Sequence, residues 1–337
     1  MRRATAVVIV NWNNWRDTIA CLDSLVCTLG SADTVIVCDN GSTDGSLDML
    51  QKWARGEHDA ATPPFIAQST KRPLPFVHYE RGQAESGGKP DDPQFVLVST
   101  GANLGFAGGC NVGLRYALAR DYAYCWLLNN DTVVTPTTLP ALRQRMDEDE
   151  TIGMCGSTLA YLHEPDTVQA LGGAQYDPAR GTGKHIGVGQ PIRANYDISA
   201  VEAQIDYVVG ASMLVSNRFL RTVGLMAEDY FLYYEEIDWA CRARGRFRCG
   251  WAPASVVYHK EGGSIGSSHR TRPSATSLHY LYRNRLHFAR KHFPHCAGRI
   301  ARAVLLDALV YFKRRDFEAT KIILGALFAA PTNPRLS

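Results

Sequence analysis

The sequence predicts an α/β fold with a mostly parallel central sheet flanked by helices and a helical extension at the C-terminus. Three observations support this prediction. Short apolar runs alternate with segments of helical spacing through the first 150 residues, which is typical of a parallel sheet with right-handed crossovers. Several of these runs end in polar residues, as strands do where an open α/β sheet binds its ligand. From about Ser274 onward the apolar spacing is helical.

The first half of the chain supplies the elements of this sheet in the order strand, helix, strand, helix. Each expected strand is a short apolar run, and each expected helix places apolar residues three or four positions apart. A segment at 56–92 interrupts this order because it is rich in Pro, Gly and charge, and we interpret it as a surface insertion with one strand at 76–79. The expected strands are 5–10, 34–38, 95–99 and 124–128, and the expected helices are 16–29, 46–54, 108–120 and 137–149.

The second half begins near Ile152 with segments of alternating character that Gly and Pro separate, which indicates antiparallel sheet with long loops. A short helix capped by Ser216 or Asn217 follows, and then a helix at 235–245 and a strand at 255–259. A loop rich in Gly, Ser and Arg precedes the helical remainder. The alternating segments are 153–161, 168–176, 184–189 and 204–216, and the loop is 262–272.

Composition and charge exclude several classes of protein. Of the 337 residues, 45% are hydrophobic and 20% are charged, which is typical of a globular chain with a large core. A net charge of +3 is too small to indicate nucleic-acid binding. The nine Cys are scattered without a CxxC pair, so neither a disulfide framework nor a zinc site is expected. No run reaches the ~18 apolar residues of a membrane span, and the first residues lack a secretory cleavage signature, so we expect a cytoplasmic protein.

Polar residues end the apolar strand at 124–128. Asn129, Asn130 and Asp131 follow it directly, and apolar residues then resume. At the carboxyl edge of an open α/β sheet, an acid can hold a hard cation beside a phosphate. Asn-Asn-Asp is equally typical of a turn, so these residues alone leave both interpretations open.

Two glycine-containing loops also follow expected strands. Asp39 ends the second strand and can accept hydrogen bonds from a ribose or a base, whereas Asp44 and Ser46 are typical of an Asx-turn and a helix N-cap. The loop at 103–111 opens a helix, whose free N–H groups attract anions. It lacks the Gly-Lys-Ser/Thr of a P-loop, and a dinucleotide fingerprint fits poorly because the loop follows the third strand.

Acids and a histidine in the second half are candidates for catalysis and metal binding. Glu235, Glu236 and Asp238 lie in the first turn of a helix after an aromatic run, where an ionised carboxylate could act as a general base. Acids are also ordinary in a first turn, and Asp238 with Arg242 would form an i,i+4 surface pair worth about 0.3–0.5 kcal/mol. Glu236 lies off that face of the helix. His259 ends an apolar strand before a glycine loop, where it is either a metal or phosphate ligand or a structural residue.

Seven motifs in register give the sequence a resemblance to a known family. They span residues 5–266 in the order in which the family has them. The chain resembles the family 2 inverting glycosyltransferases, which have the GT-A fold, and it is most similar to bacterial rhamnosyltransferase-like members of polysaccharide assembly. The motifs are VIVNWN at 8–13, DNGSTD at 39–44, NLGFAGGCN at 103–111, LNNDT at 128–132, GASML at 210–214, YYEEID at 233–238 and VYHK at 257–260.

The resemblance implies a Rossmann-like, nucleotide-binding GT-A domain with a catalytic base and a divalent cation. Glu236 falls where the family places its base, with Glu235 and Asp238 beside it. Asp131 matches the last acid of the metal-binding Asp-x-Asp, and His259 matches a histidine that completes the metal shell in some members. The implied cofactor is Mg²⁺ or Mn²⁺.

Two residues depart from the family pattern. Asn129 replaces the first acid of Asp-x-Asp, so the metal site has one charge fewer, and Glu at 236 is one methylene longer than the usual Asp. The implied donor is dTDP-rhamnose, with a UDP-hexose or UDP-galactofuranose as the alternative, and the acceptor is a glycan or lipid-linked saccharide. The residues implied to bind the nucleotide-sugar are Asn11, Asp39, Asn40, Asn103, Gly105, Phe106, Gly108, Gly109, Asn111, Asn129, Asn130 and Asp131, and those implied to bind the acceptor are Gly210, Ala211, Tyr234 and Trp239.

Two other functions remain open. A nucleotidyltransferase would carry a loop rich in Gly and Arg or Lys after the first strand, which residues 11–14 do not supply. A non-catalytic sugar-nucleotide or glycan-binding protein would not need the acids at 235–238.

The expected domain organisation is a GT-A catalytic domain at 1–270 and a helical extension at 271–337. Within the catalytic domain, 1–135 is the nucleotide-sugar-binding half and 150–270 the acceptor-binding half. The helices of the extension are basic and amphipathic, so they either cap the catalytic domain or lie on the cytoplasmic face of the inner membrane.

Overall fold

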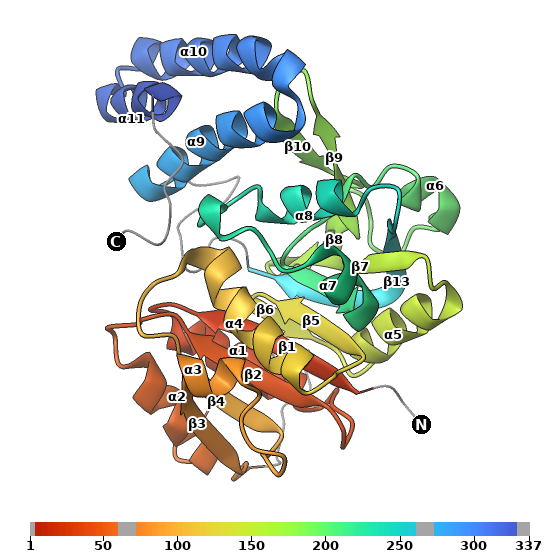
Figure 1. The fold of residues 1–337 in the computed structure, drawn as a ribbon. Helices are drawn as coiled ribbons and strands as arrows, with labels where there is room; N and C mark the ends of the chain where they lie inside the picture. Colours follow the sequence, from red (N-terminus) through yellow and green to blue (C-terminus); the bar gives the residue numbers. More distant parts are fainter. Residues whose placement is uncertain (1–3, 60–71, 261–272, 329–337) are drawn as a thin grey trace.

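The computed structural model describes residues 4–59, 72–260 and 273–328. Within them, ten strands form one large mixed sheet, whose main path runs β3-β4-β2-β1-β5-β12-β7-β13-β6 with β8 paired to β7 (Figure 1). The predicted α/β fold with a mostly parallel central sheet is confirmed. Its strands are β1 (Thr5–Asn11), β2 (Thr34–Asp39), β3 (Phe76–Glu80), β4 (Phe95–Ser99), β5 (Tyr124–Leu128), β6 (Thr132–Val134), β7 (Ile152–Tyr161), β8 (Glu164–Leu171), β12 (Ser212–Ser216) and β13 (Arg248–His259).

The first five strands of the path are parallel, so their carboxyl ends share one edge of the sheet. β12 runs antiparallel to β5 and β7, whereas β13 runs parallel to β7. The second half is therefore mixed rather than wholly antiparallel as predicted. A separate small antiparallel sheet has the order β10-β9-β11. Its strands are β9 (Gly173–Asp177), β10 (Thr182–His185) and β11 (Tyr207–Val208).

Helices cover both faces of the large sheet (Figure 1). The longer ones are α1 (Trp15–Leu25), α2 (Ser46–Arg55), α4 (Gly105–Ala119), α5 (Thr138–Glu148) and α8 (Glu235–Ala243). Short helices connect them, namely α3 (Arg81–Glu85), α6 (Ile198–Glu202), α7 (Asn217–Val223) and the 3₁₀ turn η1 (Glu228–Tyr230).

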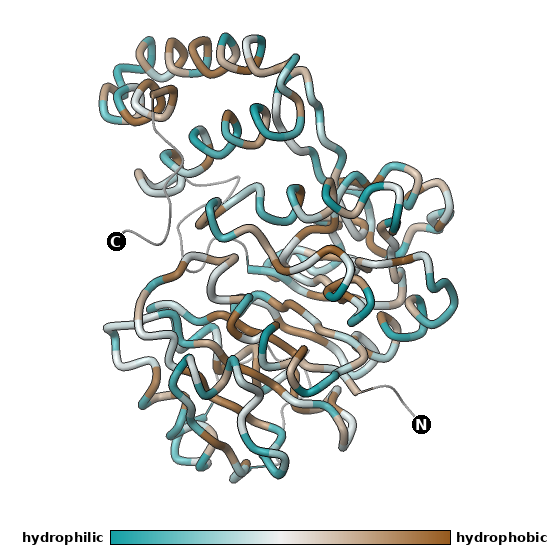
Figure 2. Tube along the Cα trace, in the orientation of Figure 1, coloured by the Kyte–Doolittle hydropathy of each residue, from teal (hydrophilic) through white to brown (hydrophobic). Residues whose placement is uncertain are grey.

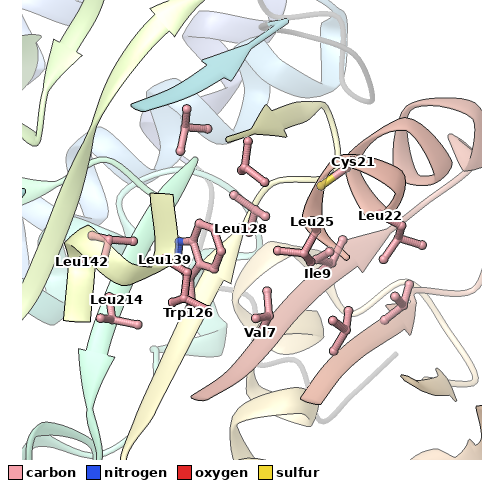
Figure 3. Packing of buried hydrophobic residues seen from close by; sticks show 14 of the residues in the cluster. Val7, Ile9, Cys21, Leu22, Leu25, Trp126, Leu128, Leu139, Leu142 and Leu214 are labelled. Carbon is pink, nitrogen blue, oxygen red and sulfur yellow. The ribbon is translucent and has the colours of Figure 1, made fainter. Parts of the chain in front are cut away.

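Alternation along the strands divides the interior into two cores. Val7 and Ile9 of β1 face a cluster that includes Leu22 of α1 and Trp126 of β5 (Figure 3). Val8 faces the opposite cluster, beneath α4. Successive side chains of a strand point to opposite faces, so the apolar run of β1 fills both cores at once.

Two predictions about the first half need correction. The segment at 56–92 is not only a surface insertion, because β3 pairs in parallel with β4 and forms the edge of the main sheet. Part of that segment, like the predicted loop at 262–272, lies outside the described residues. The helix predicted at 16–29 ends at Leu25, because a tighter turn begins there with the Thr28 N–H donating to the Leu25 carbonyl.

The C-terminal part is helical, as predicted. α9 (Ala275–His292), α10 (Ala297–Lys313) and α11 (Phe317–Phe328) pack around a shared apolar cluster that includes Leu286, Ile300 and Ile323, and the 3₁₀ turn η2 (Pro294–Cys296) links the first two. Among the described helices, none is both long and apolar enough to cross a membrane.

Candidate active site

A cavity of about 370 Å³ lies at the carboxyl edge of the parallel strands. The ends of β1, β5 and β13 and the loops after β2 and β4 form its floor, and the segment before α8 and the start of α9 close it. Its lining is Val10, Trp12, Asn40, Asn103, Gly105, Phe106, Asn129, Asn130, Asp131, Val209, Gly210, Ala211, Phe231, Leu232, Tyr233, Glu235, Glu236, His259, Thr276 and Tyr280.

The Asn40 side chain joins the loop after β2 to the loop after β4. Its Nδ2 donates to Asn103 Oδ1 at 3.1 Å and to the Gly105 carbonyl at 3.0 Å, and its Oδ1 accepts from the Leu104 N–H at 3.0 Å. Gly105 has φ +73°, and a Cβ there would overlap the Phe231 carbonyl, so only glycine fits. The glycine-containing loop thus forms a rigid wall of the cavity.

Asn11 and Asp39 lie beside each other at the ends of β1 and β2 but do not line the cavity. Asn11 Nδ2 donates to Asp39 Oδ1 at 2.8 Å, and the Ser42 N–H donates to Asp39 Oδ2 at 3.2 Å. Both residues are buried, and these bonds fix the turn after β2. Asp44 makes the predicted local turn, because its Oδ1 accepts from the Ser46 N–H at 3.0 Å.

Asp131 and His259 lie side by side in the cavity, because Asp131 directly precedes β6, and β6 pairs with the end of β13 at His259. His259 Nε2 lies 3.2 Å from Asp131 Oδ1. On the other side of the ring, His259 Nδ1 bonds to Gln169 Oε1 at 2.9 Å, and Gln169 is buried. An amide oxygen only accepts, so Nδ1 carries a proton, and Nε2 faces Asp131, to which it donates when the ring is protonated.

This pair fits a hard divalent cation as a partial ligand set. Within the described part of the chain, no three His, Cys, Asp or Glu side chains gather to hold a metal ion. Asp131 and His259 would supply two ligands, and the oxygens of a bound diphosphate together with water would complete the shell that Mg²⁺ or Mn²⁺ requires.

The Glu236 carboxylate faces the same cavity from the first turn of α8. Burial raises its pKa above the ordinary value, and hydrogen bonds from its own N–H and from the Gly210 N–H partly offset that effect. Glu235 is also buried in the lining, and burial together with the nearby Glu236 raises the pKa of Glu235 well above the ordinary value. Its Oε2 has no hydrogen-bond partner among the described residues. Burial therefore favours the uncharged form of Glu235.

The segment that leads into α8 has an unusual backbone. Phe231, Tyr233 and Tyr234 have φ of 60°, 66° and 74°, a region that costs such residues about 1–3 kcal/mol each. Asn284 of α9 holds this conformation, because its Nδ2 donates to the carbonyls of Tyr230, Leu232 and Tyr233 at 2.6, 2.7 and 3.2 Å. The C-terminal helices thereby position the acids of the cavity.

Asp238 does not belong to the cavity, which corrects its predicted catalytic position. It is fully buried, and it accepts hydrogen bonds from Tyr230, Arg242 and His292 while Lys291 pairs with it at 2.8 Å. Burial opposes its ionisation, but these cations outweigh burial and lower the pKa of Asp238. The predicted surface pair with Arg242 is therefore part of a buried network that ties α8 to α9.

Several other predicted ligand residues also lie outside the cavity. Tyr234 donates to the Gly181 carbonyl at 2.6 Å, and the buried Trp239 indole donates to the Gly224 carbonyl at 2.8 Å, so neither reaches the acceptor side. Asn111 Nδ2 is bonded to the Met226 carbonyl at 2.9 Å. Gly108 and Gly109 do not line the cavity either, because they face Leu104 and Val10 within the fold.

Sequence reasoning missed several residues of the cavity and its support. Phe231 and Tyr280 line it as a stacked pair, with ring centroids 4.6 Å apart and planes at 20°. Trp12 and Thr276 also line it, and Gln169 supports His259 from behind. Trp12 directly follows the last residue of β1, and this position at the sheet edge could have identified it. No local sequence pattern places Tyr280 beside Phe231.

A second, wider cavity of about 1110 Å³ lies between α6, the C-terminal end of α8 and the start of β13. Its arginines are paired within the protein, since Arg145 and Arg248 contact Glu202 and Arg244 contacts Asp206. The cavity with Glu236, Asp131 and His259 is therefore the better candidate for chemistry.

A mostly parallel α/β sheet with an acid-lined cavity at its carboxyl edge is the arrangement of the GT-A fold. Residues 6–62 and 81–187 match the family model described as Glycosyl transferase family 2, so this part of the chain is similar to members of that family. The unmatched stretch between them contains β3. No curated protein sequence matches the chain.

Solved structures share the fold at low sequence identity. The mannosyltransferase PcManGT from Pyrobaculum calidifontis, in complex with GDP-Man and Mn²⁺, gives a TM-score of 0.53 at 14% identity, covering 99% of this chain and 77% of that one. GalNAc-T7 with UDP, GalNAc and Mn²⁺ gives a TM-score of 0.54 at 14% identity, covering 83% of this chain and 47% of that one. Residues 1–349 of S. aureus TarS in complex with UDP-GlcNAc give a TM-score of 0.50 at 12% identity, covering 89% of this chain and 71% of that one.

Proposed function

We propose that this protein is an inverting glycosyltransferase that moves a sugar from a nucleoside-diphosphate donor to a hydroxyl of a saccharide acceptor. The observation that supports this most directly is that Glu236 faces the same cavity as the Asp131–His259 pair. One cavity thus contains a carboxylate that can take a proton and a pair of ligands suited to a divalent cation.

The donor would lie against the loops after β1, β2 and β4. Trp12 and Asn103 offer an aromatic face and an amide N–H group for the nucleoside, Asn40 fixes the position of Asn103, and Asn11 and Asp39 hold the turn behind them. Asp131 and His259 would hold Mg²⁺ or Mn²⁺, which neutralises the diphosphate when bound. Similar structures contain Mn²⁺ together with GDP-Man or UDP, which supports this arrangement.

The proposed reaction is a single displacement at the anomeric carbon. Glu236 takes the proton from the acceptor hydroxyl as the new carbon–oxygen bond forms, and the bond to the diphosphate breaks on the opposite face of the sugar. One displacement inverts the configuration. Burial favours the uncharged form of Glu235, which disfavours a second negative charge beside the base.

The first donor to test is dTDP-rhamnose, followed by UDP-hexoses and UDP-galactofuranose, and the acceptor class is a glycan or lipid-linked saccharide of cell-surface polysaccharide biosynthesis in bacteria. The sequence motifs support this choice. The Phe231–Tyr280 stack supports a saccharide acceptor, because its faces offer an apolar platform near Glu236.

The experiment has two stages. Each nucleotide-sugar is first screened by thermal shift with and without Mn²⁺, because a ligand that binds only the native state raises its Tm. Donors that bind are then incubated with saccharide acceptors, and nucleoside diphosphate release and the anomeric configuration of the product are measured. Turnover with inversion supports the proposal. Donor binding without turnover on any acceptor would favour a non-catalytic sugar-nucleotide-binding protein, and a product with retained configuration would contradict the mechanism.

A further inference from the structure

Large apolar side chains lie exposed along one side of α10. Leu305, Leu306, Leu309, Val310 and Phe312, together called the α10 face, are each between 45% and 64% exposed. Their spacing of three and four residues places them together, on the side turned away from the core that the other apolar residues of α10 form. The apolar turns are visible along α10 in Figure 2. Contiguous exposed apolar surface of this kind marks an interaction site.

Cations flank the α10 face at both of its ends. Arg299 and Arg302 lie one to two turns before it on α10, and Lys313, Arg314 and Arg315 follow it directly. All five are exposed, and within the described part of the chain none of them forms a salt bridge with a carboxylate. The nearest acid on the helix, Asp307, is paired with Arg285 at 2.7 Å. The surface therefore combines apolar groups with exposed cations.

α10 packs on α9, the helix that helps to close the candidate active site. α9 and α10 pack against each other in an antiparallel hairpin, because Arg285 of α9 contacts Asp307 of α10 and η2 links the end of one to the start of the other. The C-terminal half of α10 therefore lies beside the N-terminal half of α9, which supplies Thr276 and Tyr280 to the cavity. The α10 face itself points away from α9, because its residues lie opposite the core that the three C-terminal helices share.

We propose that the α10 face docks on the surface of an anionic lipid bilayer. Apolar side chains between clusters of cations are what such a surface binds, because the side chains enter the boundary of the acyl chains while the cations remain with the anionic headgroups. A second copy of this chain fits less well, since a symmetric contact would bring like-charged clusters together. The bilayer contact is independent of glycosyl transfer, whereas its use in presenting a lipid-linked acceptor to Glu236 rests on the proposed function.

The test is flotation of the full chain with vesicles of phosphatidylcholine alone and with vesicles that also contain phosphatidylglycerol, in the absence of donor. We expect binding only to the anionic vesicles, with less binding at higher salt. The double variant Leu306→Gln, Leu309→Gln and the double variant Arg314→Glu, Arg315→Glu should each bind at least about tenfold more weakly. Turnover of a water-soluble acceptor should be unchanged in both, because these residues lie outside the cavity.

Matched controls are available elsewhere on the surface. Val188→Gln with Ile198→Gln removes two apolar groups that are 45% and 40% exposed, and Arg180→Glu with Arg193→Glu reverses two exposed charges. Both controls should bind like the wild type. Absence of vesicle binding by the wild type, or equal losses in the control variants, would overturn the proposal. A concentration-dependent dimer that Leu306→Gln, Leu309→Gln abolishes would instead assign the α10 face to self-association.

Discussion

The Glu236 carboxylate lies directly against the backbone of Gly210, whose N–H donates a hydrogen bond to it. A Cβ on residue 210 would overlap Glu236 Oε1, so the contact exists only because this residue is glycine. The bond links the acid of α8 to the loop before β12. It also favours the ionised form of a carboxyl group that burial would otherwise keep neutral.

The variant Gly210→Ala should therefore displace the carboxylate and impair catalysis. We expect kcat to fall by at least about tenfold, because small displacements of a reacting group cost large factors in rate. Steady-state kinetics and donor titration would measure the effect, with donor affinity largely retained. The control is Gly298→Ala in α10, where a Cβ meets no neighbour within 4 Å. If Gly210→Ala retains full turnover, Glu236 does not act from the position described.

Replacement of the base itself should have a larger effect. We expect Glu236→Gln to lower kcat by about 10²-fold or more while donor binding persists, which is the usual scale for loss of a general base. In the wild type, activity should rise with pH through the raised pKa of Glu236, because only the ionised form accepts a proton. Rate–pH profiles of both proteins decide the question. If Glu236→Gln keeps the rise of activity with pH that the wild type shows, the group that titrates, and therefore the base, is not Glu236.

The neutral state of Glu235 gives a prediction for stability against pH. Burial raises the pKa of Glu235 in the folded state. The contribution of its protonated carboxyl to the free energy of unfolding is therefore fully present below the unfolded-state pKa of about 4.3. This contribution is lost as pH rises through the folded-state pKa. Glu235→Gln should thus raise Tm relative to the wild type, by about 2 °C or more, with a difference that grows as pH increases. Differential scanning calorimetry across pH measures this. The exposed Glu150→Gln should show no such trend, and an equal trend in both variants would refute the assignment.

Gln169 should influence metal affinity without touching the cation. Its Oε1 holds the proton of His259 on Nδ1 and so leaves Nε2 able to ligate. We expect Gln169→Leu to weaken Mn²⁺ binding by about 10–100-fold, the usual effect of losing such a partner. Isothermal titration with Mn²⁺ and a nucleoside diphosphate would measure it. Unchanged affinity in Gln169→Leu, together with unchanged affinity in Asp131→Asn, would show that the cation binds elsewhere or not at all.

Asn284 should be essential to the conformation before α8. In Asn284→Asp the side chain keeps its shape but loses both N–H donors, which leaves buried carbonyls of the strained segment without partners. We expect the free energy of unfolding to fall by about 1–3 kcal/mol and kcat to fall as well. Chemical denaturation and kinetics on the same samples measure the two effects. Asn195→Asp makes the same change at an exposed site and should alter neither.

The strands and their polar ends could be predicted because they depend on local pattern. Unbroken β-branched runs such as β1 can be buried on both faces, and this identifies a parallel sheet without further information. The positions of Asn129, Asn130 and Asp131 follow from the same reasoning, since the end of a parallel strand is the edge of the sheet. All three line the cavity.

Contacts between distant segments could not be predicted in this way. Asp238 is only two residues from Glu236, yet the turn of α8 directs it away from the cavity, toward Lys291 and His292 of α9. Phe231 and Tyr280 meet only because α9 folds back over the sheet. The sequence contains the residue types, but loops of many residues separate them, and their packing decides which pairs meet.

By itself, the sequence determined the fold class, the positions of the first parallel strands and the polar edge at which a ligand would bind, because apolar periodicity and strand ends are properties of neighbouring residues. Only the tertiary structure decided that Glu235 and Glu236 face the cavity while Asp238 does not. It alone brought His259 to 3.2 Å from Asp131, and it placed Asn284 where it supports the backbone before α8. These relationships depend on the packing of α9 and β13 against the sheet, which joins residues far apart in the chain.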